Sequence, residues 1–191
     1  MIRIIHEKVP LRPGASLHCV DQDLKSDFGC PYHRHPEFEV VRIDESSGAI
    51  QVGDWTGRFQ AGEIYVFGGE LPHAFFNDSD TLRARSRYLQ FMPDLLSSLA
   101  EALPEMRGIS DLLHRARRGL RVHGDAGCTV SDCLDAVFAT QGIEQMAELF
   151  RLMAAIQSSP GSTELASESY SPGHSDQHIV RLDKVLSYIH D

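Results

Sequence analysis

The residues best suited to carry chemistry lie in one short segment, which reads His33-Arg34-His35-Pro36-Glu37-Phe38-Glu39. Successive side chains of an extended strand point to opposite faces, so both histidines share a face with Glu37 and Glu39. A third imidazole, His73, follows a Gly68-Gly69 turn further along the chain. Imidazoles and carboxylates together bind divalent transition metals. We therefore predict a metal site with open coordination positions, formed by His33, His35, Glu39 and His73.

Three histidines and one carboxylate give an N₃O ligand set, which suits Zn²⁺, Ni²⁺, Fe²⁺ or Mn²⁺. The alternative is that these polar groups line the mouth of a barrel and contact water or a small organic molecule. Glu37 follows Pro36, which can turn its side chain away, so we expect a surface carboxylate there. Cys30 precedes His33 closely enough to add a thiolate ligand, although a free cysteine is more often a small core residue.

Two further sets of side chains have a binding interpretation and an ordinary structural one. The first set could form the apolar wall of a small-molecule pocket or belong to the core, and consists of Trp55, Tyr65, Phe67 and Phe75, together with Phe76. The second set is Arg83, Arg85 and Arg87, which alternate along one strand and therefore share a face. A solvated strand face is the common role of such a row, and presentation of positive charge to an anionic ligand is the alternative.

The elements that position these residues are short strands. A strand is expected within residues 2–11, another at 15–20, and polar turn material at 21–29. Residues 37–43 are rich in β-branched side chains and are expected to be buried on both faces. A hairpin is expected across Gly53-Asp54, and further strands follow up to Phe91. About eight short strands at this spacing predict a β-sandwich or small barrel.

From Pro93 the apolar period changes from two residues to 3.6, which predicts helices. Four are expected, beginning at Pro93-Asp94, at Ser110-Asp111, at Thr129 or Ser131, and at Glu144. The last one runs to Gln157 and carries an apolar stripe formed by Met146, Leu149, Phe150, Met153 and Ile156. This stripe either packs on the strands or faces a second copy of the chain.

The C-terminal part of the sequence changes character again. Residues 158–177 are dense in Ser, Pro and Gly, which predicts a flexible linker. Apolar residues then return at helical spacing from Ile179 to Ile189. A single helix after a linker cannot build a core, so we expect the sequence to be part of a longer protein.

Composition limits the classes of function. The chain has 191 residues, 42% of them hydrophobic and 24% charged, as is usual for a globular protein of one domain with a smaller appendage. The net charge of −9 argues against these residues gripping a phosphate backbone. The absence of a long apolar run and of a signal-peptide pattern predicts a cytoplasmic protein with no membrane contact and with reduced cysteines.

The strand region resembles the two signature motifs of the cupin superfamily. In the first motif His33, His35 and Glu39 match, whereas Gly29 and Gly48 are displaced from the expected glycine positions. In the second motif Gly62, His73 and Asn77 match, whereas Gly68-Gly69-Glu70 replaces a P-x-G turn. The resemblance implies a mainly β fold, a cupin-type double-stranded β-helix (jelly-roll barrel), followed by a C-terminal helical region. It also implies that the four matched His and Glu positions bind metal.

The order of the segments resembles the AraC family of transcription regulators. The similarity includes Val52-Gly53-Asp54, Leu71-Pro72-His73 and Leu112-Leu113-x-x-Ala116-Arg117-Arg118-Gly119-Leu120. It implies a cupin barrel at 1–92, a helical dimerisation region at 93–157, the linker at 158–177, and at 178–191 the first helix of a truncated helix-turn-helix domain. The chain would then be the sensor portion of a regulator, not an enzyme.

The partners implied by this resemblance are a second copy of the chain, a small-molecule effector and, through the missing C-terminal domain only, DNA. The alternative is a metal-dependent cupin enzyme, such as a dioxygenase or an isomerase, in which the same ligands leave positions open for substrate or O₂.

Overall fold

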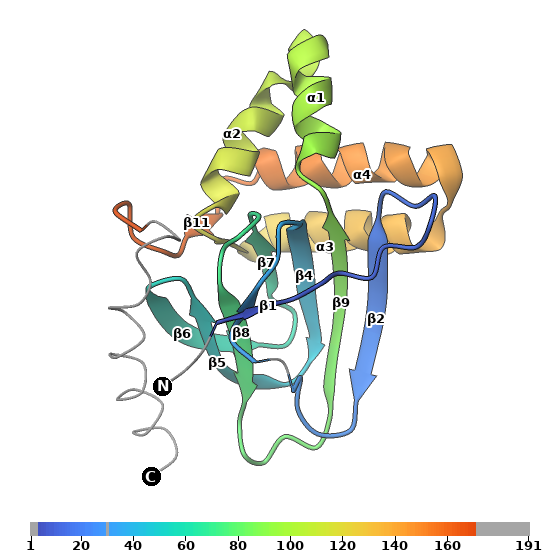
Figure 1. Cartoon of the computed structure of the whole chain (residues 1–191). Coiled ribbons are helices and arrows are strands. Elements are labelled where there is room, and N and C mark those ends of the chain that lie inside the picture. The colour runs from blue at the N-terminus through green and yellow to red at the C-terminus, as the bar shows by residue number, and fades with distance from the viewer. Residues whose placement is uncertain (1–3, 30, 171–191) are drawn as a thin grey trace.

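The computed structural model describes residues 4–29 and 31–170, and it is mainly β with a few helices. Strands form two sheets with largely antiparallel pairing, and the helices gather on one side of them (Figure 1). The predicted mainly β fold and the predicted helices after Pro93 are confirmed. No helix in the described part of the chain is long and apolar enough to cross a membrane.

The smaller sheet has five strands, and it carries two of the three predicted histidine ligands. Its strand order is β1 (Ile5–His6), β3 (His33–Arg34), β8 (His73–Asn77), β5 (Ser47–Val52) and β6 (Trp55–Gln60). The pairs are antiparallel except β1 with β3, which is parallel. The predicted hairpin across Gly53-Asp54 joins β5 to β6.

The larger sheet has six strands, all paired antiparallel. Its order is β11 (Thr163–Glu164), β10 (Leu120–Val122), β7 (Ile64–Phe67), β4 (Phe38–Glu45), β9 (Ala84–Phe91) and β2 (His18–Leu24). Strand β4 lies between β7 and β9. Its apolar residues alternate between two cores, one shared with the helices and one shared with the smaller sheet, which explains why they occur on both faces.

One face of the larger sheet packs on the helices. Alternate residues such as Val40, Val66 and Leu89 form one core with the helices, and each is fully buried. The helices are α1 (Asp94–Ala102), α2 (Arg107–Ala116), α3 (Gly124–Ala139) and α4 (Gly142–Gln157), with a 3₁₀ turn, η1 (Pro104–Met106), between the first two. Burying each such aliphatic side chain stabilises the fold by about 1.5–3 kcal/mol.

The other face of the larger sheet is turned to the smaller sheet. Val41, Ile43, Tyr65 and Phe67 from one sheet and Ile50, Val52, Phe59 and Phe75 from the other belong to a second core. This core fills only part of the space between the sheets, and the remainder is the cavity described below.

Several element boundaries differ from those predicted. Strand β2 continues through residues 21–24, which the sequence suggested were a turn, because Asp21 and Asp23 pair across the ladder with Arg87 and Arg85 of β9. Opposite charges on neighbouring strands stabilise such a pairing. Helix α3 begins at Gly124, before the predicted Thr129 or Ser131, and the N-terminal strand is limited to Ile5–His6.

The predicted flexible linker is ordered in its first part. Strand β11 pairs with β10, and the backbone of Leu165 donates to the carbonyl of Gly119 at 2.9 Å. The side chains of Leu165 and Ala166 are 8% and 0% exposed, so this segment packs on the sheets. Because β10 and β11 complete the larger sheet, the strand region also extends beyond the predicted boundary at residue 92. The predicted helix at 178–191 lies outside the described residues.

Candidate functional site

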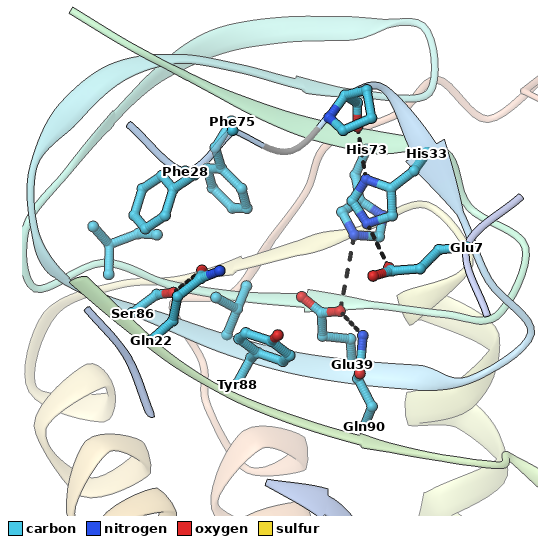
Figure 2. Close-up of a pocket in the computed structure, with 14 residues that line it drawn as sticks. Glu7, Gln22, Phe28, His33, Glu39, His73, Phe75, Ser86, Tyr88 and Gln90 are labelled. Carbon is cyan, nitrogen blue, oxygen red and sulfur yellow. Dashed lines mark hydrogen bonds and ion pairs between the residues drawn. The ribbon is translucent and has the colours of Figure 1, made fainter. Parts of the chain in front are cut away.

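A cavity of about 310 Å³ lies between the two sheets (Figure 2). Pockets for small organic ligands begin at about this volume. Residues of both sheets and of the loops between them line it: Glu7, Gln22, Phe28, Gly29, Pro31, His33, Glu39, Val41, Ile43, His73, Phe75, Ser86, Tyr88 and Gln90. Three of the four predicted metal ligands are therefore at the cavity wall.

The fourth predicted ligand, His35, lies against the other two histidines. His33 and His73 are direct partners in the antiparallel pairing of β3 with β8, and their ring centroids are 4.3 Å apart. The His35 ring is 5.3 Å from the His73 ring and nearly perpendicular to it. One ring nitrogen of each histidine lies within 4.8 Å of the others, and all three side chains are buried.

Backbone carbonyls orient all three imidazoles in the same manner. The Nδ1 atoms of His33 and His73 lie 2.9 Å from the carbonyl oxygens of Pro31 and Leu71, and that of His35 lies 3.1 Å from the carbonyl of Glu37. A hydrogen bond from Nδ1–H to a carbonyl leaves the lone pair on Nε2. A histidine that binds a metal through one ring nitrogen usually donates such a hydrogen bond from the other. With Nδ1 engaged in this way, Nε2 is the ring nitrogen of each histidine that is left to bind a metal.

Glu39 supplies a carboxylate beside these nitrogens. Its Oε2 lies 3.1 Å from His35 Nε2 and 3.9 Å from His73 Nε2. Gln90, its partner across the β4–β9 ladder, donates from Nε2 to the same oxygen at 2.7 Å. Atoms bound to one ion at about 2.1 Å lie about 3.0 to 3.4 Å apart. Glu39 meets this range with His35 but lies outside the set of three histidines whose ligand atoms are within 4.8 Å of one another, so its side chain and the imidazoles must move together to bind one ion.

The charges of the cluster are set by burial and by these contacts. Burial alone would raise the pKa of Glu39, but the hydrogen bond with His35 and the charges of the neighbouring imidazoles lower it to about 2. Burial, reinforced by His33, lowers the pKa of His73 to about 3. For His35, burial opposes protonation, yet the contact with Glu39 raises the pKa. Without metal, the cluster therefore holds a neutral His73 beside a pair of opposite charges, His35 and Glu39.

The neutral state of His73 predicts a loss of stability in mild acid. An unfolded histidine titrates near pH 6.5, whereas folded His73 titrates at about 3. Between these values only the unfolded chain binds this proton, so the free energy of unfolding falls as the pH drops from 6.5 towards 4.5, by at most about 1.4 kcal/mol per pH unit. Urea unfolding of the metal-free protein measures this slope. We expect His73→Gln to flatten it and the exposed-site control His114→Gln to leave it unchanged.

Glu37 is not the surface carboxylate that the sequence suggested. It is only 6% exposed, and its Oε2 lies 3.5 Å from His35 Nδ1. The chain bends at Pro36 and Glu37, which interrupts the strand alternation and turns the side chain under the His35 ring. This oxygen has no hydrogen-bond partner among the described residues. Its position favours a supporting role beside His35.

Of the five aromatic residues predicted as a possible pocket wall, Phe75 alone lines the cavity, and Phe76 does not. Phe67 stacks on the His73 ring at 4.2 Å, Tyr65 donates to Glu63 at 2.6 Å, and Trp55 packs at the edge of the core. The sequence reasoning missed Phe28 and the inward-facing row of β9, which is Ser86, Tyr88 and Gln90. The alternation of arginines along β9 was the available signal, because the residues between them must face inward.

The arginine row lies on the outer face of the larger sheet and forms ion pairs. Arg83 contacts Asp23 at 2.6 Å, and Arg87 contacts Asp21 at 3.0 Å and Asp135 of α3 at 2.7 Å. Arg85 lies 3.7 Å from both Asp21 and Asp23. These ion pairs agree with a structural role of the row. Cys30 lies outside the described residues, and the described cysteines are free thiols: Cys19, Cys128 and Cys133.

No protein-family model matches the sequence, and no curated protein matches it. Among solved structures, ToxT from Vibrio cholerae with a bound unsaturated fatty acid has a TM-score of 0.52 and 13% sequence identity, over 83% of this chain and 61% of that chain. An apo ToxT variant gives 0.50 and 11%, over 74% and 54%. The AraC-like transcriptional activator CuxR gives 0.44 and 12%, over 78% and 51%.

The likeness is one of fold. At 11–13% sequence identity, the similarity to the two ToxT structures supports the fold of this chain alone, and the resemblance to the AraC family stays a prediction. This chain spans only about half to three fifths of the length of these proteins. The cupin assignment stays a prediction.

Proposed function

We propose that this chain is the effector-sensing portion of a DNA-binding transcription regulator of the AraC family, built on a cupin-type jelly-roll barrel. The observation that carries the proposal is the cavity of about 310 Å³ between the sheets, with a histidine cluster at one end. The fold similarity to ToxT, one structure of which holds an unsaturated fatty acid, supports a small-molecule effector.

The cavity has two chemically different walls. The larger sheet contributes neutral hydrogen-bonding groups from Gln22, Ser86 and Gln90, whereas Phe28 and Phe75 form an aromatic pair with ring centroids 5.9 Å apart. An organic effector with one polar side and one apolar side fits this arrangement. Effector binding that differs between two arrangements of the subunits would shift their populations and so alter DNA binding.

In this proposal a divalent metal, Zn²⁺, Ni²⁺, Fe²⁺ or Mn²⁺, is held by His33, His35, His73 and Glu39. The buried Nε2 of His73 has no hydrogen-bond partner in the described part of the chain, and one ring nitrogen of each of the three histidines lies within 4.8 Å of the others, which supports this proposal. A bound ion would supply a positive charge that attracts an anionic group of the effector.

DNA contact belongs to another part of the full-length protein in this proposal. The present residues carry a net charge of −9, which repels a phosphate backbone. The test uses the protein from its native gene: an intact mass well above 21.3 kDa, together with DNA binding that changes when an effector is added, supports the regulator. A native mass of 21.3 kDa without DNA binding would refute it.

We also propose that a second copy of the chain binds along α4. The predicted apolar stripe is mostly core, since Leu149, Met153 and Ile156 are fully buried. Phe150 instead belongs to an outward row of exposed apolar residues, Ile143, Ala147, Phe150 and Ala154, whose spacing follows one helix face. Such a row is a typical helix-packing surface.

Phe150→Glu tests this dimer contact. A carboxylate in the centre of an apolar contact must be desolvated, so we expect the variant to sediment as a monomer at concentrations where the parent is a dimer. Leu82→Glu is the matched control, because Leu82 is 87% exposed in the turn between β8 and β9, away from α4. A Phe150→Glu protein that still forms the dimer would place the contact elsewhere.

The second candidate is a metal-dependent enzyme, and the ligand cluster itself favours it. Three imidazoles and one carboxylate leave coordination positions free for substrate or O₂. Fe²⁺-, Mn²⁺- or Ni²⁺-loaded protein that turns over a substrate, with no DNA-binding activity in the native protein, would support the enzyme over the regulator.

A further inference from the structure

A second carboxylate reaches the histidine cluster from the N-terminal arm, residues 5–9. Strand β1 pairs in parallel with β3, with Ile5 opposite His33 and His6 opposite Arg34. Alternation along this pair places Glu7 on the face of the sheet that holds His33. Its Oε2 lies 3.2 Å from His33 Nε2, and the residue also lines the cavity.

Glu7 and Glu39 therefore both lie next to the histidine rings (Figure 2). The separation of 3.2 Å between Glu7 Oε2 and His33 Nε2, like the 3.1 Å between Glu39 Oε2 and His35 Nε2, falls within the range of about 3.0 to 3.4 Å for two atoms bound to one ion. Each carboxylate is close to part of the cluster only, since the set of ligand atoms within 4.8 Å of one another consists of the three histidines, so both carboxylates must move inward to share one ion. The buried His73 Nε2, without a hydrogen-bond partner in the described residues, lies in the same cluster.

The arm has few other attachments at this point. The backbone of Ile5 donates to Tyr32 at 3.0 Å, and that of Glu7 donates to Arg34 at 2.9 Å. On the opposite side of the arm, the exposed side chain of His6 contacts Glu70 at 3.6 Å. Ile5 is 45% exposed, whereas Val9 at the end of the arm is buried. Because a two-residue strand has few bonds to hold it, a further bond from Glu7 would change its stability strongly.

We propose that Glu7 is a metal ligand in addition to Glu39, so that metal binding fixes the N-terminal arm across the cavity; this inference rests on the metal site of the proposed function. The ligand set is then three imidazoles and two carboxylates. It suits five- or six-coordinate ions such as Ni²⁺, Fe²⁺ or Mn²⁺ better than Zn²⁺, which is usually four-coordinate in proteins.

The test uses Co²⁺ as a spectroscopic probe on the whole chain, with Glu7→Gln and the matched control Glu70→Gln. Both carboxylates are 42% exposed and both contact a histidine, but only Glu7 reaches the cluster. We expect Glu7→Gln to weaken Co²⁺ binding at least about tenfold and to shift the visible spectrum towards lower coordination. Glu70→Gln should leave affinity and spectrum unchanged.

Trypsin cleavage after Lys8 gives a second readout. Metal should slow this cleavage in the parent and in Glu70→Gln, but not in Glu7→Gln, because only Glu7 links the arm to the ion. A Glu7→Gln protein with the parent's affinity, spectrum and protection would overturn the role of Glu7 and leave the metal site standing. A parent that binds no Co²⁺, Ni²⁺ or Zn²⁺ would overturn the metal site and this inference together.

Discussion

We expect His35→Ala to abolish metal binding. His35 lies between the two other imidazoles and the Glu39 carboxylate, at 3.1 Å from the latter. Removing a residue that hydrogen-bonds to a metal ligand already weakens metal binding by about 10- to 100-fold, so the loss of a ligand itself should exceed that range. Metal content after dialysis and isothermal titration with Ni²⁺ and Zn²⁺ measure the effect.

The same change should destabilise the metal-free protein. Glu39 is 5% exposed, and without His35 its buried charge keeps, among the described residues, the hydrogen bond from Gln90 and the neutral His73 at 3.9 Å. Breaking a buried pair by removing one partner costs about 3–5 kcal/mol. The double variant His35→Ala/Glu39→Gln removes the unpaired buried charge of Glu39 and should recover part of the lost stability. The difference between the two variants separates the electrostatic effect from the effect of lost packing.

His114→Ala is the matched control, because this histidine is exposed on α2. It should leave both metal content and stability unchanged. Full metal content in a folded His35→Ala protein would show that the ion, if bound, is held by other residues.

Most of the large strands could be predicted from the sequence, because their signals are local. The β-branched run in β4 and the turn at Gly53-Asp54 depend only on neighbouring residues. Strands β10 and β11 could not be predicted in this way, since they are only three and two residues long and their pairing partners are distant in sequence. Tertiary pairing, rather than propensity, places them in the sheet.

The histidine cluster was predictable for a similar reason: an H-x-H pattern in a strand and a third histidine after a turn leave few alternatives. The exposure of Glu37 was predicted wrongly. The sequence indicates a bend at Pro36 but not the direction in which Glu37 then points, and in the structure its side chain lies against the His35 ring. The approach of Glu7 could not be inferred, since it results from a parallel pairing between residues far apart in the chain.

The Gly68-Gly69-Glu70 turn, where the sequence departs from the cupin motif, leads to the second prediction of a large effect. A Cβ on Gly69 would lie 2.3 Å from the carbonyl oxygen of Pro36 and 3.1 Å from its carbon. The next residue, Glu70, donates its backbone N–H to the carbonyl of His35 at 2.7 Å and has a φ of +63°. The turn therefore packs directly against the backbone that carries His35, with no room for a side chain.

We expect Gly69→Ala to push the backbone of residues 35–37 away from the turn. Overpacking of this kind costs about 1–3 kcal/mol, and the displaced His35 ring should also weaken metal binding. Urea unfolding of the metal-free protein measures the first effect, and titration with Ni²⁺ measures the second.

Gly127→Ala is the matched control, and we expect it to change the stability in the opposite direction. Gly127 lies within α3, and a Cβ there meets no atom within 4 Å. Alanine in a helix is more favourable than glycine by about 0.5–1 kcal/mol, so this variant should be more stable than the parent and bind metal equally well. If Gly69→Ala instead matched the parent in both measurements, the turn would be free to move away from Pro36. The close contact between the turn and the His35 backbone would then not be what positions the ligand.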